Sequence, residues 1–93
     1  MIIPVTTVRL HTPWVQSLKE KRMVVKSLLS KLRTKFNIAA AEVDEQDTHK
    51  IVVIAVVAIA ADMAQADSVM DHVLNYIEGH CDAEVIRVER EIR

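Results

Sequence analysis

Hydrophobic residues recur with two different periods along this 93-residue chain. Residues 2–10 are rich in β-branched side chains and alternate toward their end, which predicts a strand, and residues 11–16 form a loop. Ser17 and Glu20 then have the spacing of a helix capping box. Apolar residues at 3.6-residue spacing predict a helix from there to Phe36, with an apolar face made of Leu18, Val25, Leu28, Leu29, Leu32 and Phe36.

The second half of the chain predicts two strands, a helix and a last strand. Residues 38–44 predict a strand, the polar residues 45–48 a turn, and residues 49–61 a longer strand. The run IVVIAVVAIAA within 49–61 has no polar residue on either face, so we expect a central strand with both faces covered. Asp62 and Gln65 give a second capping pattern, and Gly79 is expected to end that helix in a left-handed cap. Residues 83–92 predict the fourth strand, and the helix before it has an apolar face of Met63, Ala66, Val69, Met70, Val73, Leu74 and Ile77.

The order of elements is therefore strand, helix, strand, strand, helix, strand. Right-handed crossovers would place the four strands in one antiparallel sheet, in the spatial order 4-1-3-2, with both helices on one face. The sequence thus predicts a ferredoxin-like α+β fold, formed by a single domain over residues 1–93.

Composition narrows the class of protein. Only three residues are aromatic, so the core must be aliphatic. The single cysteine, Cys81, and the absence of a signal-like opening segment predict a cytoplasmic protein. The longest apolar run is too short for a membrane helix, which needs about 20 residues. The lone glycine excludes glycine-rich phosphate loops and dinucleotide fingerprints, and we expect no cofactor.

Charge is distributed unevenly along the chain. The first 41 residues carry eight bases and one acid, whereas residues 42–93 carry twelve acids and four bases. On the first helix Lys19, Arg22, Lys26 and Arg33 fall within about 60° of arc, a set that we call the basic flank. It is predicted to face the edge formed by the second strand, and an acidic row of Asp67, Asp71 and Glu78 on the second helix is predicted to face the opposite edge.

The basic flank has two interpretations. It is a surface for the phosphate backbone of RNA or the ribosome, or a solvated face that keeps the protein soluble. The central strands carry none of the aromatic residues on which RNA-recognition sheets stack bases. We therefore expect recognition by charge and shape, and no reading of a DNA sequence.

The sheet face away from the helices is a second candidate. Side-chain alternation assigns it Ile3, Val5, Thr7, Arg9, His11, Glu42, Asp44, Arg87 and Glu89. These residue types suit an acid–base or ligand site, but cross-strand ion pairs are the favoured interpretation. The apolar centre of the face predicts packing against another subunit, and hence a homo-oligomer.

Other sites are less well supported by the residues. His11, Asp44, Asp47 and His49 are metal-ligating types, but their spacing matches no ligand motif, so no metal is predicted. The loop after the first strand lacks the arginine and glycines that would cradle a phosphate in an acylphosphatase-like site. Trp14 in that loop is either a hot spot for a partner or a cap on the core. No catalytic constellation emerges, and we expect a non-enzymatic protein.

Several segments resemble a known family, the YlxP-like bacterial proteins. They are SLKEKR at 17–22, KSLLSKLRTKFN at 26–37, AEVDEQD at 41–47 and VERE at 88–91. The resemblance implies a short cytoplasmic protein of unknown function with a ferredoxin-like fold. The family's genes often stand among translation-initiation and ribosome-maturation genes, which implies a link to translation. The family usually has His where this chain has Glu45, and it supplies no catalytic residue.

Two functions remain open. The first is a non-enzymatic surface-interaction factor associated with translation, the ribosome or RNA. The second is a dimeric, ligand-binding regulatory domain of the ferredoxin-like type.

Overall fold

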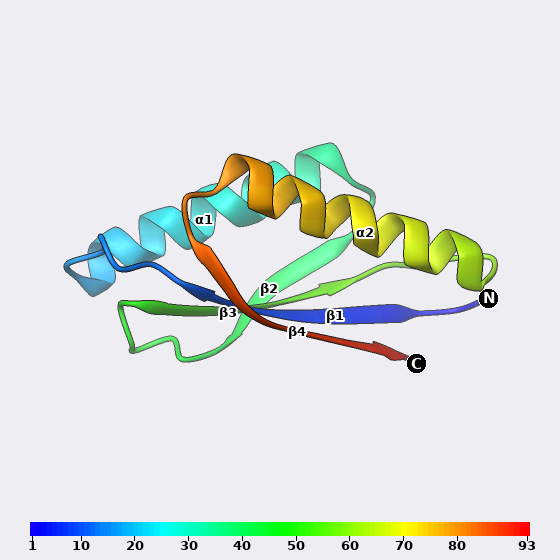
Figure 1. Cartoon of the computed structure of the whole chain (residues 1–93), viewed down its shortest axis with the longest axis horizontal. Helices are drawn as coiled ribbons and strands as arrows, with labels where there is room; N and C mark the ends of the chain where they lie inside the picture. The colour runs from blue at the N-terminus through cyan, green and yellow to red at the C-terminus, as the bar shows by residue number, and fades with distance from the viewer.

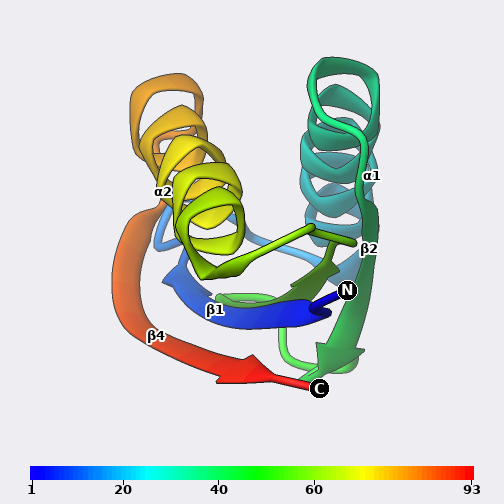
Figure 2. The ribbon, with the colours of Figure 1, turned by 90° about the vertical axis from the view of Figure 1, so that its right-hand side faces the viewer.

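The computed structural model describes all residues, 1–93, as one sheet covered by two helices. The strands run antiparallel in the order β2-β3-β1-β4, and both helices lie on one face (Figures 1 and 2). The predicted ferredoxin-like α+β fold is thereby confirmed, and no helix has the length and apolar character needed to cross a bilayer. In chain order the elements are β1 (Pro4–His11), α1 (Leu18–Lys35), β2 (Ala39–Asp44), β3 (Ile51–Val57), α2 (Met63–His80) and β4 (Glu84–Ile92).

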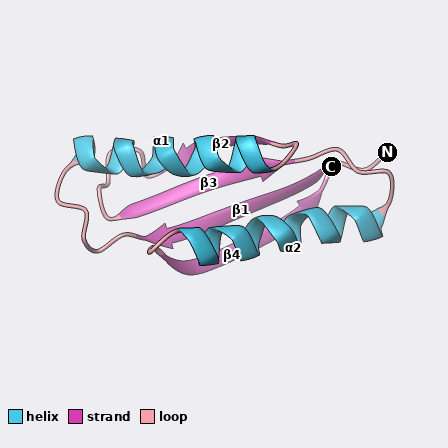
Figure 3. Cartoon of the chain, turned by 90° about the horizontal axis from the view of Figure 1, so that it is seen from above, coloured by secondary structure: helices cyan, strands magenta, loops and turns pink.

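The core lies between the helices and the sheet. Seen from above, α1 lies toward the β2 side and α2 toward the β4 side (Figure 3). Along β1, buried residues alternate with half-buried ones, because one side of the strand packs under the helices and the other faces away from them. The most completely buried apolar side chains are Val8, Leu10, Val15, Leu32, Val52, Ile54, Val56, Met70, Val73 and Ile77.

Each helix begins at a side-chain cap that the sequence predicted. The Ser17 hydroxyl accepts a hydrogen bond from the Glu20 N–H at 3.1 Å, and the Asp62 carboxylate accepts one from the Gln65 N–H at 2.9 Å. The return bonds go one residue further back than in a simple capping box. Glu20 accepts from the Gln16 N–H at 3.2 Å, and Gln65 accepts from the Ala61 N–H at 2.6 Å.

Two local predictions are wrong. Gly79 does not form a left-handed cap: it lies inside α2, no glycine has a positive φ, and the helix ends at Cys81 in extended backbone with φ −139°. The last turn is supported instead by His80, whose ring stacks on Tyr76 with centroids 4.0 Å apart. The third strand spans Ile51–Val57 and not 49–61, because β2 offers no neighbour beyond Ala39 and Pro4, opposite Ala58, has no N–H to donate. Beyond it, Ile2 and Ala60 form only an isolated bridge.

The cap on α1 gives a direct test of how this helix begins. Ser17→Ala is expected to lower the free energy of unfolding by about 0.5–2 kcal/mol, because the Glu20 N–H loses its side-chain acceptor. Ser30→Ala is the matched control, since Ser30 is exposed in the middle of α1. Urea denaturation of both variants provides the measurement. Equal midpoints for Ser17→Ala and the wild type would contradict the assigned cap.

Candidate functional site

Lys21 is a charged side chain buried in the core side of α1. Only 1% of its surface is exposed. Its ammonium group donates to the main-chain carbonyls of Glu45 and Thr48, the latter at 2.6 Å, and lies 3.0 Å from a carboxylate oxygen of Glu42. Two of its three donors are thus hydrogen-bonded to main-chain carbonyls, and the Glu42 carboxylate compensates the charge as an ion pair. Because a buried charge without partners is very costly, this arrangement fixes α1 against the turn between β2 and β3.

The β2–β3 turn is built around Glu45. Glu45 has a φ of 54°, in the left-handed region that residues with a Cβ seldom adopt. The Asp44 carboxylate accepts from the Glu45 N–H at 2.8 Å, and the Thr48 N–H donates to the Glu45 carbonyl at 3.0 Å. On its outer side, the Glu45 carboxylate pairs with Arg9 at 2.6 Å. Glu45 therefore links Lys21 beneath the helices to Arg9 on the opposite sheet face.

A β-bulge at Val43 changes the orientation of the residues on either side of it. Glu42 pairs with Ile54, whereas Asp44 pairs with the adjacent Val53, so one residue of β2 is left over. Glu42 lies before the bulge and alternates in step with the buried Ala40, so it points to Lys21 and the helices, and its predicted place on the open sheet face is wrong. The bulge acts after Glu42, where it turns Asp44 to the other face. Asp44, in contrast, lies on the open face as predicted from the sequence.

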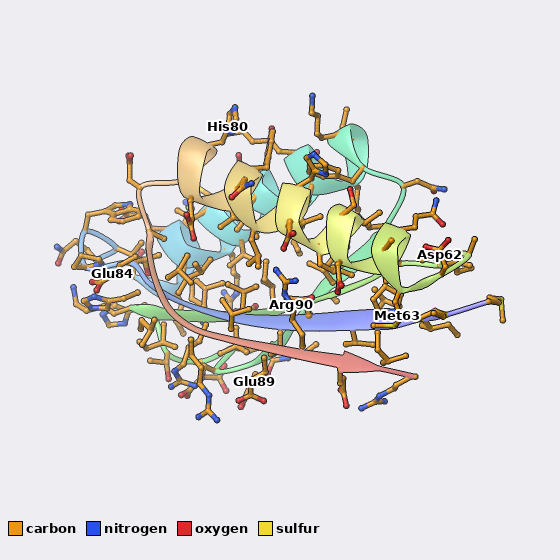
Figure 4. All side chains as sticks on the ribbon, turned by 45° about the vertical axis from the view of Figure 1, so that its right-hand side comes forward. Asp62, Met63, His80, Glu84, Glu89 and Arg90 are labelled. Atoms are coloured by element: carbon orange, nitrogen blue, oxygen red, sulfur yellow. The ribbon has the colours of Figure 1, made fainter.

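The open sheet face carries the other residues assigned to it. Figure 4 shows Glu89 pointing away from the helices. A shallow hollow of about 310 Å³ is lined by Thr7, Arg9, Asp44, Val53, Arg87 and Glu89. Ile3, Val5 and His11 are half-buried. They alternate in step with Arg9 along β1 and the residue before it, and therefore lie on the same face of the sheet as Arg9.

Ion pairs dominate this hollow. Arg9 and Arg87 are direct neighbours across β1 and β4, yet each arginine has its own acid. Arg9 pairs with Glu45 at 2.6 Å, and Arg87 with Glu89 at 2.7 Å. At the far end of β1, His11 Nδ1 lies 3.9 Å from a carboxylate oxygen of Glu84. Both arginines of the hollow are therefore paired, and no three His, Cys, Asp or Glu residues gather as a metal site would require.

The apolar middle of the open face is less exposed than its composition suggests. Val53 is 5% exposed, and Ile51, Ala55 and Val57 are half-buried although no helix covers this side. Long side chains of neighbouring strands shield them, because such side chains can lay their aliphatic stems over apolar surface. That another subunit packs on this face stays a prediction.

The basic flank of α1 lies beside the edge strand β2. Lys19, Arg22 and Lys26 are exposed and take part in none of the ion pairs of the molecule. Arg33 differs, because its guanidinium donates to the Ala40 carbonyl of β2 and so occupies part of that free strand edge. The basic flank therefore presents three cations without a partner in the protein, whereas its fourth, Arg33, is hydrogen-bonded to β2.

The opposite edge of the molecule is acidic. Asp67, Asp71 and Glu78 are exposed on α2 on the side of β4. Arg90 rises from β4 toward α2 (Figure 4) and pairs with Asp71 at 2.7 Å. The chain thus separates charge across the fold, with uncompensated cations at the β2 edge and mostly uncompensated acids at the β4 edge.

Trp14 lies in a loop that Lys50 fixes. The Lys50 ammonium donates to the carbonyls of Pro13 at 2.7 Å and Val15 at 3.2 Å, and Val15 is fully buried. Trp14 itself is 39% exposed. Its surface is divided between the protein and the solvent, and both interpretations of this residue stay open.

A further hollow, of about 350 Å³, lies between α1 and the end of α2. Met23, Val24, His80 and Cys81 are among the residues that line it. His80 is engaged with Tyr76, through ring stacking and a contact of 3.0 Å between its Nδ1 and the Tyr76 carbonyl. His80 Nδ1 is thus directed to its own helix, and none of the hydrogen bonds of the molecule joins His80 to Cys81.

Lys21 was not singled out from the sequence, although a signal was present. It precedes Val25 by four residues, Leu28 by seven and Leu32 by eleven, and all three are buried. Those spacings place Lys21 in the middle of the apolar face of the helix. A lysine is almost never fully buried at such a position unless its charge is paired. Its acidic partner, Glu42, was instead assigned to the open sheet face.

Removal of the buried ammonium tests its structural role. Lys21→Met is expected to destabilise the fold by about 3 kcal/mol, the lower end of the range for breaking a buried pair, because Glu42 keeps 18% of its side chain exposed. Lys19→Met removes an exposed charge from the same helix and should change stability by less than about 0.5 kcal/mol. Urea denaturation compares the two, and similar losses in both variants would contradict the role assigned to Lys21.

The two best-resembling segments meet at this lysine: Lys21 lies within SLKEKR, and Glu42 and Glu45 lie within AEVDEQD. A family model described as "Protein of unknown function (DUF503)" matches residues 3–90. The "Uncharacterized protein YlxP" of Bacillus subtilis (strain 168) is 32% identical over 68 residues, which cover 73% of this chain and 74% of that protein. The resemblance to YlxP-like proteins is confirmed, and the chain belongs to the DUF503 family of proteins of unknown function.

Proposed function

We propose that this protein is a non-catalytic factor of the translation machinery that binds RNA through the sugar–phosphate backbone along the basic flank of α1. The observation that carries the proposal is the row formed by Lys19, Arg22 and Lys26, exposed and without acidic partners. Cations already paired within a protein gain little from a phosphate. Unpaired ones release counterions from the nucleic acid when they bind.

The position of the row supports contact with an extended strand. Lys19 and Lys26 are separated by about 10 Å along the helix axis, at 1.5 Å per residue, with Arg22 between them. In Figures 2 and 3, α1 lies over the β2 side of the sheet and α2 over the β4 side. Because Arg33 of the basic flank bonds to β2, while Lys31 on the other side of α1 lines the hollow next to α2, the flank is turned away from α2. The link to translation comes from the family resemblance alone.

A ligand-binding regulatory domain is less well supported. The hollow on the open face has arginines that would suit an anionic ligand, but Glu45 and Glu89 already satisfy them. A ligand would have to displace one of these ion pairs. The α1 row requires no such displacement, and it therefore favours RNA.

The salt dependence of RNA binding tests the proposal quantitatively. Each phosphate contact contributes about 0.7 to the log–log slope for single strands, so three unpaired cations predict a slope of roughly −2. Arg22→Gln/Lys26→Gln should weaken binding strongly and reduce the slope to about −0.7. Fluorescence anisotropy with a generic single-stranded RNA and co-sedimentation with ribosomes at several salt concentrations provide the measurements.

Lys31→Gln/Lys35→Gln is the matched control for that experiment. It removes the same charge from the same helix, but from the side of α1 that lies toward α2, where Lys31 lines the hollow with Cys81. The control should bind RNA with nearly the wild-type slope. Equal losses in both double variants would indicate a non-specific charge effect. Binding by neither variant nor wild type at low salt would refute RNA contact and favour the regulatory domain.

A further inference from the structure

The strand β4 is a free edge of the sheet that exposes apolar side chains among its five charged residues. It is nine residues long, and eight of these are exposed. Ile86, Val88 and Ile92 are 50%, 39% and 48% exposed, respectively. Soluble proteins normally protect such an edge, because its unpaired N–H and C=O groups invite another strand.

The other edge, β2, shows such protection. A bulge at Val43 interrupts it, and the Arg33 side chain donates to the Ala40 carbonyl. β4 has one irregularity, at Ile86 near its start, and continues without interruption from Arg87 to Ile92. The two edges of one sheet are therefore treated differently, and only β4 keeps a long run available for pairing.

Backbone hydrogen bonds show which groups of β4 point outward. Arg93 and Ile3 exchange two bonds, from the Arg93 N–H to the Ile3 carbonyl at 2.8 Å and from the Ile3 N–H to the Arg93 carbonyl at 3.2 Å. In an antiparallel pair such bonds alternate along the strand. The N–H and C=O groups of Val88, Arg90 and Ile92 must then point away from β1, toward the free edge.

We infer that β4 pairs antiparallel with β4 of a second copy of this chain, about a two-fold axis at Val88, so that two four-stranded sheets join into one. About this axis Val88 meets its own copy through outward-pointing backbone groups. Arg87 then stands opposite Glu89 of the second copy, and Glu89 opposite its Arg87. Both contacts are favourable cross-strand pairs that join the Arg87–Glu89 ion pairs of the two copies into one alternating cluster without breaking either, and the interface is self-complementary as two-fold symmetry requires.

Neighbouring registers are less favourable. An axis at Arg87 or Arg90 brings each arginine opposite its own copy, and an axis at Glu89 or Glu91 does the same for a glutamate. Directly opposed like charges destabilise a sheet. Among registers centred from Arg87 to Glu91, only the one at Val88 has no such opposition.

The acidic row of α2 is compatible with this arrangement. Asp71 of this row contacts β4, where Arg90 pairs with it at 2.7 Å and neutralises its charge. Arg90 lies two residues along the strand from the axis at Val88. Asp67 and Glu78 lie about 6 Å and 10 Å from Asp71 along the helix. The basic flanks of the two copies would remain at the two outer edges, so this pairing leaves the proposed RNA surface free and stands independently of it.

A charge-exchange experiment tests the register. By light scattering, the wild type at micromolar concentration should have twice the chain mass of 10.5 kDa. Glu89→Arg and Arg87→Glu should each shift the protein to the monomer mass, because each places like charges opposite one another. The combined variant Arg87→Glu/Glu89→Arg restores opposite charges and should restore the dimer. Both side chains are more than half exposed, so folding should persist, and circular dichroism verifies it.

Three further variants complete the test. Val88→Pro removes an outward N–H that β1 does not use, and it should abolish the dimer. Asp47→Arg, an equivalent charge change in the exposed β2–β3 turn, should leave the dimer intact, as should Ala41→Lys on the open face of β2. A monomeric wild type, or a charge-exchanged variant that stays monomeric, would overturn the inference. Dissociation by Ala41→Lys without dissociation by Val88→Pro would instead place the interface on the open face.

Discussion

The contact on which this structure depends is the buried ammonium of Lys21. It joins the first turns of α1 to the β2–β3 turn, two segments that the chain separates by more than twenty residues. Water is replaced around this charge by two carbonyls and the Glu42 carboxylate. Because a buried lysine charge is very costly without its partners, the contact fixes both the axial position of α1 and the shape of the turn.

The same contact explains irregular features that otherwise look unrelated. The bulge at Val43 lets Glu42 face Lys21 while Asp44 faces the opposite side of the sheet, and the left-handed backbone of Glu45 presents its carbonyl to the same ammonium. The strain of that backbone, about 1–3 kcal/mol for such conformations, is held by the surrounding bonds. The carboxylate of Glu45 is then available to Arg9 on the other face. One buried charge thus helps to organise an ion pair on the open sheet face.

The bases of α1 consequently do different things, although they look alike in the sequence. Lys21 is structural, Arg33 occupies the β2 edge, and only Lys19, Arg22 and Lys26 form an unpaired row beside it. Counting the basic residues in this stretch of sequence therefore overestimates the number of cations that are available to a partner. The number that remains sets the expected strength and salt dependence of any phosphate contact.

The element order, the strand order and both caps follow from periodicity and local hydrogen bonding, which depend on residues close together in sequence. The inward orientation of Glu42 does not, because it depends on the register of β2 against β3 and on the distant Lys21. The left-handed cap predicted at Gly79 was wrong because a glycine permits such a conformation but does not impose it. The position of the basic flank was predictable from helix geometry, whereas the engagement of Arg33 required the neighbouring strand.

Lysine-reactivity footprinting by mass spectrometry, with and without bound RNA, tests the division between structural and binding lysines most directly. Lys21 should resist acetylation in both states, because its ammonium is buried, hydrogen-bonded to two carbonyls and paired with Glu42. Lys19 and Lys26 should react freely in the absence of RNA and be protected by it, while Lys31 and Lys35 on the other side of α1 should react equally in both states. Rapid modification of Lys21, or RNA protection that fails to distinguish the two sides of the helix, would contradict this account.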